Sequence, residues 1–166
     1  MEHTLHGPNL DLPAIEQRPT FLVHQINAEL ARVCNPLFKR FGVDLITSRI
    51  LVIVLEQPGI YVGDIVRLMA LPQSTVSHQI RRLEEQALVR RMPDAHDKRV
   101  FLVHLTQRGA EAASACNRLS ARIYESLFAD VKPREMARLQ KVLKAMANRL
   151  AACEPREFEA PAEAVT

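Results

Sequence analysis

The chain has 166 residues, of which 48% are hydrophobic and 25% charged, and its formal net charge is +3. This length suits one ordinary domain, or one small domain with long helical extensions. No apolar run approaches the ~20 residues of a membrane span. The N-terminus lacks the pattern of a secretion signal, so we expect a cytoplasmic protein. Cys34, Cys116 and Cys153 are odd in number and widely spaced, which argues against a disulfide framework or a zinc cluster.

The first part of the chain is predicted to form an arm and three helices. Three prolines and little periodicity in residues 1–19 indicate a flexible arm. Apolar residues recur at spacings of three and four over 20–41, which predicts a helix that Pro36 should bend or end one turn early. A second helix, with Asp44 as its N-cap, and a short third helix over 62–69 should follow.

The period of the pattern changes in the second part of the chain. The remaining predicted elements are, in chain order, a helix from Pro72 with a buried face of Val76, Ile80 and Leu83, two strands over 88–92 and 100–105, a helix from a Thr106 N-cap to about Ala129, and a helix from Pro133 to about Ala152. The residues between the two strands are typical of a hairpin turn.

The net charge is concentrated in residues 72–108. Seven Arg and Lys residues in this segment outnumber four Asp and Glu residues, a surplus of three that equals the formal charge of the whole chain. A neutral body with a localised basic segment is typical of a polyanion binder. We therefore interpret the chain as a nucleic-acid-binding protein.

The helix from Pro72 follows another short helix after a tight turn, which is the order of a helix-turn-helix. The major groove of DNA admits one α-helix, whose leading turns need small polar residues and whose later turns need cations. The expected contacts are Gln73, Ser74, Thr75, Ser77, His78 and Gln79 with bases, and Arg81 and Arg82 with phosphates. The alternative is an ordinary solvated helix face, but such a face would be richer in Glu and Lys.

The hairpin tip, made of His96, Asp97, Lys98 and Arg99, is the second expected DNA contact. A guanidinium on a narrow ribbon can enter the minor groove, where the negative potential attracts it. Asp97 is placed to orient Arg99 by a charge-assisted bond. The alternative is a polar turn with a local ion pair.

These motifs resemble those of the multiple-antibiotic-resistance regulator (MarR) family. The run from Asp97 to Gly109 matches the family pattern D-x-R…L-T-x-x-G, and residues 74–91 resemble its recognition helix and first wing strand. The resemblance implies a homodimer with interlocked terminal helices on a palindromic operator. It also implies repression relieved by a small ligand, often an anionic aromatic one. Two positions depart from the pattern: Ala87 replaces the usual Gly, and Tyr61 stands where a capping Ser or Thr is common.

A dimer is also expected from the helices themselves, because long amphipathic helices at both ends of a small head have no core to cover them. The residues expected to pair are Leu22, Ile26, Leu30, Ile123, Leu127, Leu139, Val142, Leu143, Met146 and Leu150. The alternative is a monomeric helical bundle.

By resemblance, the ligand pocket should lie between the dimer helices and the head. The candidate residues are His24, Asn27, Leu45, Ile46 and Arg49. Arg49 can pair with a carboxylate; alternatively it contacts a phosphate or forms a surface ion pair.

Other functions find little support in the sequence. The six histidines lack metal-ligand spacing, so we expect no metal and no cofactor. No acid is placed to orient His78 beside Ser74 and Ser77, so we expect no enzyme. Two alternatives remain: a ligand-blind architectural DNA-binding protein, and a thiol-based redox-sensing regulator that uses Cys34 or Cys116.

The expected fold is mainly α with a small β-hairpin wing: a winged helix-turn-helix head with N- and C-terminal dimerisation helices. The expected organisation is a flexible arm (1–19), a dimerisation helix (20–43), the DNA-binding region (44–108), dimerisation helices (109–152) and a flexible tail (153–166).

Overall fold

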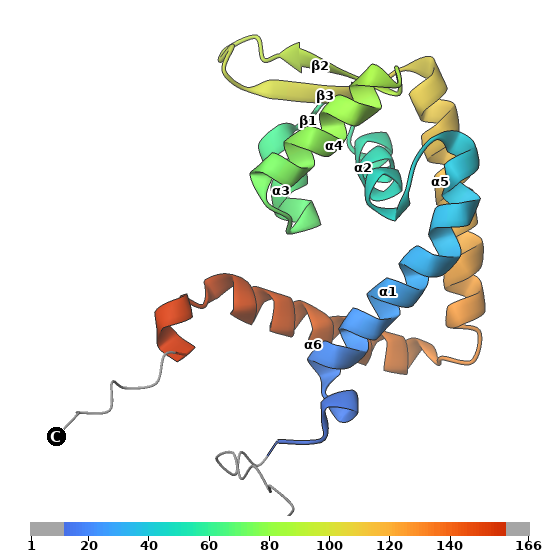
Figure 1. Cartoon of the computed structure of the whole chain (residues 1–166), viewed down its shortest axis with the longest axis vertical. Helices are drawn as coiled ribbons and strands as arrows, with labels where there is room; N and C mark the ends of the chain where they lie inside the picture. The colour runs from blue at the N-terminus through green and yellow to red at the C-terminus, as the bar shows by residue number, and fades with distance from the viewer. Residues whose placement is uncertain (1–11, 159–166) are drawn as a thin grey trace, which may run out of the picture. The chain divides into compact units, whose positions relative to one another are not determined.

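The computed structural model describes residues 12–158, and its chain forms two compact units, Met1–Ala121 and Arg122–Thr166. The helices are α1 (Pro19–Phe38), α2 (Leu45–Glu56), α3 (Val62–Met69), α4 (Gln73–Glu85), α5 (Gln107–Leu127) and α6 (Pro133–Ala152). The strands are β1 (Ile60–Tyr61), β2 (Val89–Pro93) and β3 (Phe101–Leu105), and short 3-10 turns lie at Ile15–Gln17, Lys39–Phe41 and Pro155–Phe158. The predicted fold class, mainly α with a small antiparallel wing, is confirmed (Figure 1).

The ends of the chain are only partly covered by the structure. Of the predicted N-terminal arm, residues 1–11 lie outside the described residues, and the part that is described already contains a 3-10 turn before α1. Of the predicted tail, 159–166 lie outside as well.

Among the described helices, none has both the length and the apolar character needed to cross a membrane.

The end of α1 follows from Pro36, which lies inside the helix and has no N–H to donate. The helix continues only to Phe38 and then tightens into the 3-10 turn that ends at Gly42. Gly42 has φ +77°, a left-handed conformation that suits glycine. The chain then enters α2 through Asp44, which caps the helix as the sequence predicts.

The core of the first unit lies between α2, α3, α4 and the sheet. Its largest fully buried side chains include Phe38, Ile50, Leu51, Val54, Ile65, Val76, Ile80, Leu83, Leu88 and Val103. The three predicted apolar positions of α4 are all in this set, so the polar side of the helix is left toward solvent.

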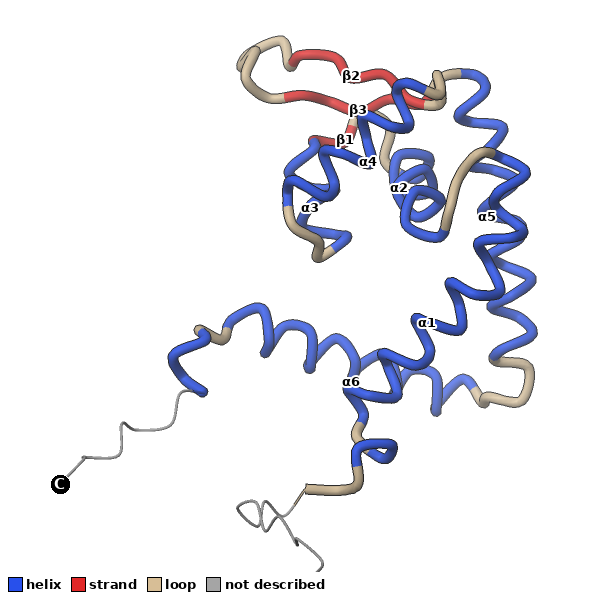
Figure 2. Tube along the Cα trace, viewed as in Figure 1, coloured by secondary structure: helices blue, strands red, loops and turns tan. Residues whose placement is uncertain are grey.

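The sheet has three antiparallel strands in the order β1-β3-β2 (Figure 2). In the wing, Val89 is opposite Leu105 and Pro93 is opposite Phe101. The sequence analysis missed β1, because a strand of two residues is too short to show an alternating pattern. This strand ties the start of α3 to the wing.

The start of α5 explains the L-T-x-x-G motif. The Thr106 hydroxyl accepts a hydrogen bond from the Gly109 N–H (2.9 Å) and donates one to the Ala87 carbonyl oxygen (2.7 Å). A Cβ on Gly109 would lie 1.8 Å from the Leu88 carbonyl oxygen, so only glycine fits there. The motif therefore joins the start of α5 to the turn that follows α4.

Ala87, which stands where the family pattern has glycine, adopts the left-handed conformation with φ +55°. Ala70, which follows α3, is also left-handed at φ +49°, which the sequence did not indicate. Both alanines end helices where glycine is usual.

The second unit is formed by the end of α5 and by α6. No residue of α6 is buried. Its exposed large apolar residues, with those of the end of α5, are Tyr124, Leu127, Leu139, Val142, Leu143 and Leu150. This unit therefore leaves apolar surface exposed.

Candidate nucleic-acid interface

The polar side of α4 is the first part of the candidate interface. Gln73, Ser74, His78 and Arg81 are exposed, and Thr75, Ser77, Gln79 and Arg82 are half-buried. Within residues 12–158, no side chain of the segment 73–79 makes a hydrogen bond to another residue. The polar groups of the leading turns are therefore available to an external partner.

Gln79 differs from its neighbours on this face. Its side-chain oxygen is buried, and within the described residues it has no hydrogen-bond partner. A buried acceptor without a partner is costly. The side-chain oxygen of Gln79 is therefore not presented to solvent, as a base contact through it would require.

Ion pairs divide the basic residues of segment 72–108 into two groups. Arg82 pairs with Asp44 (3.0 Å) and Arg91 pairs with Glu84 (2.7 Å). The other five are exposed and have no ion pair within residues 12–158: Arg81, Arg90, Lys98, Arg99 and Arg108. The charge offered to a polyanion comes mainly from this second group.

The Arg91–Glu84 pair connects strand β2 of the wing to α4. Glu84 accepts from both the backbone N–H (3.1 Å) and the side-chain Nε (2.9 Å) of Arg91. Burial acts to raise the pKa of Glu84, but the bonds from Arg91 outweigh it and lower that pKa. The guanidinium also lies over the Phe101 ring, 5.9 Å from its centroid. The sequence analysis missed this pair, since it depends on how β2 lies against α4.

The wing tip is organised by Asp94, a residue that the sequence analysis did not select. Its Oδ1 accepts from the backbone N–H groups of His96 (2.8 Å) and Asp97 (3.0 Å), and its Oδ2 accepts from the Tyr61 hydroxyl (3.1 Å). These backbone hydrogen bonds lower the pKa of Asp94. The tip is thereby tied to Tyr61, the residue that precedes α3.

Asp97 acts differently from the expectation. Its carboxylate accepts from the backbone N–H of Arg99 (2.9 Å), and no ion pair joins it to the Arg99 guanidinium within the described residues. The physical reason is the spacing, because an aspartate side chain readily bonds the main chain two residues on in a turn. Asp97 fixes the backbone of the tip and leaves the guanidinium exposed.

The five candidate ligand residues are only partly brought together. Arg49 Nη1 donates to Asn27 Oδ1 over 3.4 Å, which links α2 to α1. His24 and Arg49 are exposed, Ile46 is half-buried and Leu45 is buried. A surface hollow of about 350 Å³ lies elsewhere, lined by Arg40, Phe41, Gly42, Leu88, Arg108, Glu111 and Ala112. None of the candidate ligand residues lines it, so their role stays a prediction.

The thiols of Cys34 and Cys116 are buried. Burial raises the pKa of Cys34, and it raises the pKa of Cys116 to about 11. Because the thiolate is the reactive form, both residues are poor peroxide targets at neutral pH. Within residues 12–158, no group of three His, Cys, Asp or Glu side chains is placed to hold a metal ion.

The helix pair α3–α4 followed by the β2–β3 wing defines a winged helix-turn-helix protein. Residues 41–100, which include most of this head, match the sequence model of the MarR family. The HTH-type transcriptional repressor IacR of Pseudomonas putida is 22% identical over 148 residues, 89% of each chain. The head of the chain is therefore similar to that of the MarR family, and the chain as a whole is similar to this repressor.

Solved structures have the same fold. The transcriptional regulator SlyA superposes with a TM-score of 0.73 at 25% identity, over 78% of this chain and 91% of that chain. The MepR–DNA complex of S. aureus has a TM-score of 0.72 at 22% identity, over 79% of this chain and 96% of that chain, which shows the fold alone. Proteins of the MarR family are DNA-binding transcriptional regulators and not enzymes.

Proposed function

We propose that this protein is a cytoplasmic, homodimeric repressor that binds a palindromic operator and is released by a small ligand. The observation that carries the proposal is the polar side of α4, where the leading turns offer side chains with no bond to the described part of the chain. Such groups can bond base edges in the major groove without first breaking an internal contact. Arg81 on the same helix and Lys98 and Arg99 on the wing supply exposed cations for the backbone and the minor groove.

The homodimer is supported by apolar faces that each unit leaves in water. On α1, Ile26 is 58% exposed, and Leu22, Val23, Val33 and Leu37 are exposed as well. Removing such surface from water is favourable by about 25 cal/mol per Å². We assign dimerisation to residues 20–43 and 109–152. A two-fold axis would present two heads to DNA, which requires two half-sites of inverted sequence.

Repression and ligand release are supported less directly. The relative IacR is named as a transcriptional repressor. Arg49 is exposed and its contact with Asn27 is long at 3.4 Å, so its guanidinium is available to a ligand carboxylate. An anionic aromatic compound is the ligand class that the family resemblance suggests.

The two alternative functions are less well supported. An architectural protein needs mainly cations and apolar wedges, whereas the leading turns of α4 carry Gln, Ser, Thr and His. A redox sensor needs an accessible thiolate, whereas Cys34 and Cys116 are buried.

Selection from a library of random DNA duplexes tests the proposal. The wild-type protein should enrich one sequence with inverted symmetry, and binding to it should weaken ~10³–10⁵-fold between 50 and 200 mM salt if six to ten phosphates are contacted. Enrichment of no sequence, with equal affinity for all duplexes, would favour the architectural alternative.

A further inference from the structure

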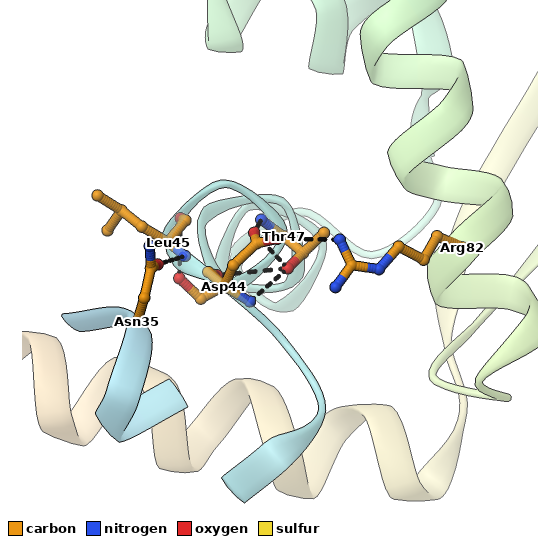
Figure 3. A network of polar contacts seen from close by, with 6 residues as sticks. Asn35, Asp44, Leu45, Thr47 and Arg82 are labelled. Carbon is orange, nitrogen blue, oxygen red and sulfur yellow. Dashed lines mark hydrogen bonds and ion pairs between the residues drawn. The ribbon is translucent and has the colours of Figure 1, made fainter. Parts of the chain in front are cut away.

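Three helices of the first unit meet at the N-terminus of α2 (Figure 3). From α1, Asn35 Oδ1 accepts a hydrogen bond from the backbone N–H of Leu45 (2.8 Å). At the first turn of α2, Asp44 Oδ1 accepts from the backbone N–H of Thr47 (2.8 Å), and the Thr47 hydroxyl accepts from the Asp44 N–H (2.9 Å). From α4, Arg82 Nη1 donates to Asp44 Oδ2 (3.0 Å). This junction joins the end of α1, the start of α2 and the recognition helix.

The carboxylate of Asp44 is fixed by contacts within its own helix, independently of Arg82. One oxygen takes part in the capping box with Thr47, and the other faces Arg82. Burial acts to raise the pKa of Asp44, but the bonds from Thr47 and Arg82 outweigh it and lower that pKa, so the group is ionised at neutral pH. Pairs between two mobile surface chains contribute little. In this pair the acceptor, Asp44, is fixed by its own helix. The Arg82 side chain is 41% exposed and the Asp44 side chain 33% exposed.

Arg82 also lies on a different side of α4 from the exposed cation beside it. Its next neighbour Leu83 is fully buried, whereas Arg81 is exposed. Figure 3 shows the Arg82 side chain extending from α4 to Asp44. A phosphate contact through Nη1 of Arg82 would compete with this ion pair.

We propose that Arg82 is a positioning residue, which fixes the recognition helix α4 against the N-terminus of α2 and does not contact a DNA phosphate. This inference rests on the proposed function, in which α4 reads DNA. It replaces the role expected from the sequence, where Arg81 and Arg82 form one pair of phosphate contacts. The orientation of α4 then depends on Asp44, which is not on this helix but caps α2.

Four variants separate the two roles of Arg82. Asp44→Asn keeps a good N-cap and an oxygen for Thr47 but removes the charge that Arg82 meets. Arg82→Met keeps an apolar stem of similar length without the guanidinium. The double variant D44N/R82M measures the coupling between the two positions. Arg81→Ala is the matched control, an exposed cation on the same helix without an ion pair in the described part of the chain.

The readout is binding to the duplex of highest affinity that the wild-type protein selects from a random library, measured over a series of salt concentrations. Asp44→Asn and Arg82→Met should each weaken binding about 5- to 30-fold, and the double variant should be no weaker than either. Neither should change the dependence on salt. Arg81→Ala should reduce the salt slope by about one.

The phosphate role predicts the opposite pattern. In that case Arg82→Met lowers the salt slope by about one, and Asp44→Asn tightens binding because Arg82 is released to the DNA; this result would overturn the proposal. If no duplex is selected, the proposed function is wrong, and amide hydrogen exchange in the free protein still tests the positioning. Exchange in α4 should be faster in Asp44→Asn and Arg82→Met than in Arg81→Ala, and equal rates in all three would refute it.

Discussion

Gly109 stands where any side chain would collide with the backbone that leads into the wing. A Cβ there would lie 1.8 Å from the Leu88 carbonyl oxygen, which is main chain and has little freedom to move. We expect Gly109→Ala to lower the free energy of unfolding by about 2–4 kcal/mol, measured by urea denaturation. Gly63→Ala is the control, since a Cβ there meets nothing within 4 Å. Equal urea midpoints for Gly109→Ala and the wild type would contradict this reading of the motif.

Tyr61 is the residue that departs from the family's usual helix cap, and the structure gives its hydroxyl another partner. It donates to Asp94 (3.1 Å) and so connects the start of α3 to the wing tip. We expect Tyr61→Phe to weaken DNA binding about 2- to 10-fold, the usual worth of one hydrogen bond, with little change in melting temperature. Tyr124→Phe, the same change at the other tyrosine of the chain, should leave affinity unaltered. Normal DNA binding by Tyr61→Phe would show that the wing does not depend on this bond.

Asp44 should make stability depend on acid pH. Its pKa is lowered in the folded protein, so its stabilising effect is complete above the ordinary pKa of an aspartate and is lost as pH falls through the folded pKa. We therefore expect the wild type to be more stable than Asp44→Asn at pH 7 and the difference to shrink below about pH 4. Urea midpoints across this range measure it, and a difference that grows in acid would have the wrong sign.

At the residue scale, exposure of the recognition-helix face could be predicted from the sequence, but the pairing of individual charges could not. Arg81 and Arg82 are neighbours of the same residue type. Arg81 is exposed without an ion pair in residues 12–158, whereas Arg82 forms an ion pair with Asp44, 38 positions away. Spacing along the chain carries no information on such a contact. Asp94 was missed because its role depends on the turn that it forms.

The elements themselves were largely predictable from periodicity and capping. The third and last helices have the predicted bounds. The last helix starts at Pro133, whose fixed φ favours a first turn. The caps at Asp44 and Thr106 are confirmed. The two-residue strand β1 and the left-handed Ala70 were not predictable, since neither leaves a periodic signal.

The proposed role of the wing in DNA binding can be tested directly at Arg99. Arg99 lies at its tip with an exposed guanidinium, while Asp97 fixes the backbone below it. We expect Arg99→Ala to weaken operator binding about tenfold or more, with melting temperature and dimerisation almost unchanged. Arg99→Lys should recover only part of the loss, because an ammonium is more strongly hydrated. Gel-shift titration with sedimentation distinguishes these outcomes; unaltered operator binding by Arg99→Ala would remove the wing from the interface.

At the scale of the whole molecule, the exposed apolar face of α1 is the feature that a single chain leaves unexplained. Ile26 is 58% exposed, so Ile26→Asp should be tolerated by the isolated chain but should disfavour a dimer through this face. We expect sedimentation velocity to show monomers at concentrations where the wild type is dimeric, and operator affinity to fall with them. A variant that stays fully dimeric would place the subunit interface elsewhere.

Site-specific recognition by two symmetric heads is the central claim, and hydroxyl-radical footprinting of the wild type on its selected duplex tests it most directly. We expect one protected site, made of two inverted halves about one helical turn apart, with further minor-groove protection on each flank where the wings lie. Protection that spreads evenly along the duplex, regardless of sequence, would contradict it.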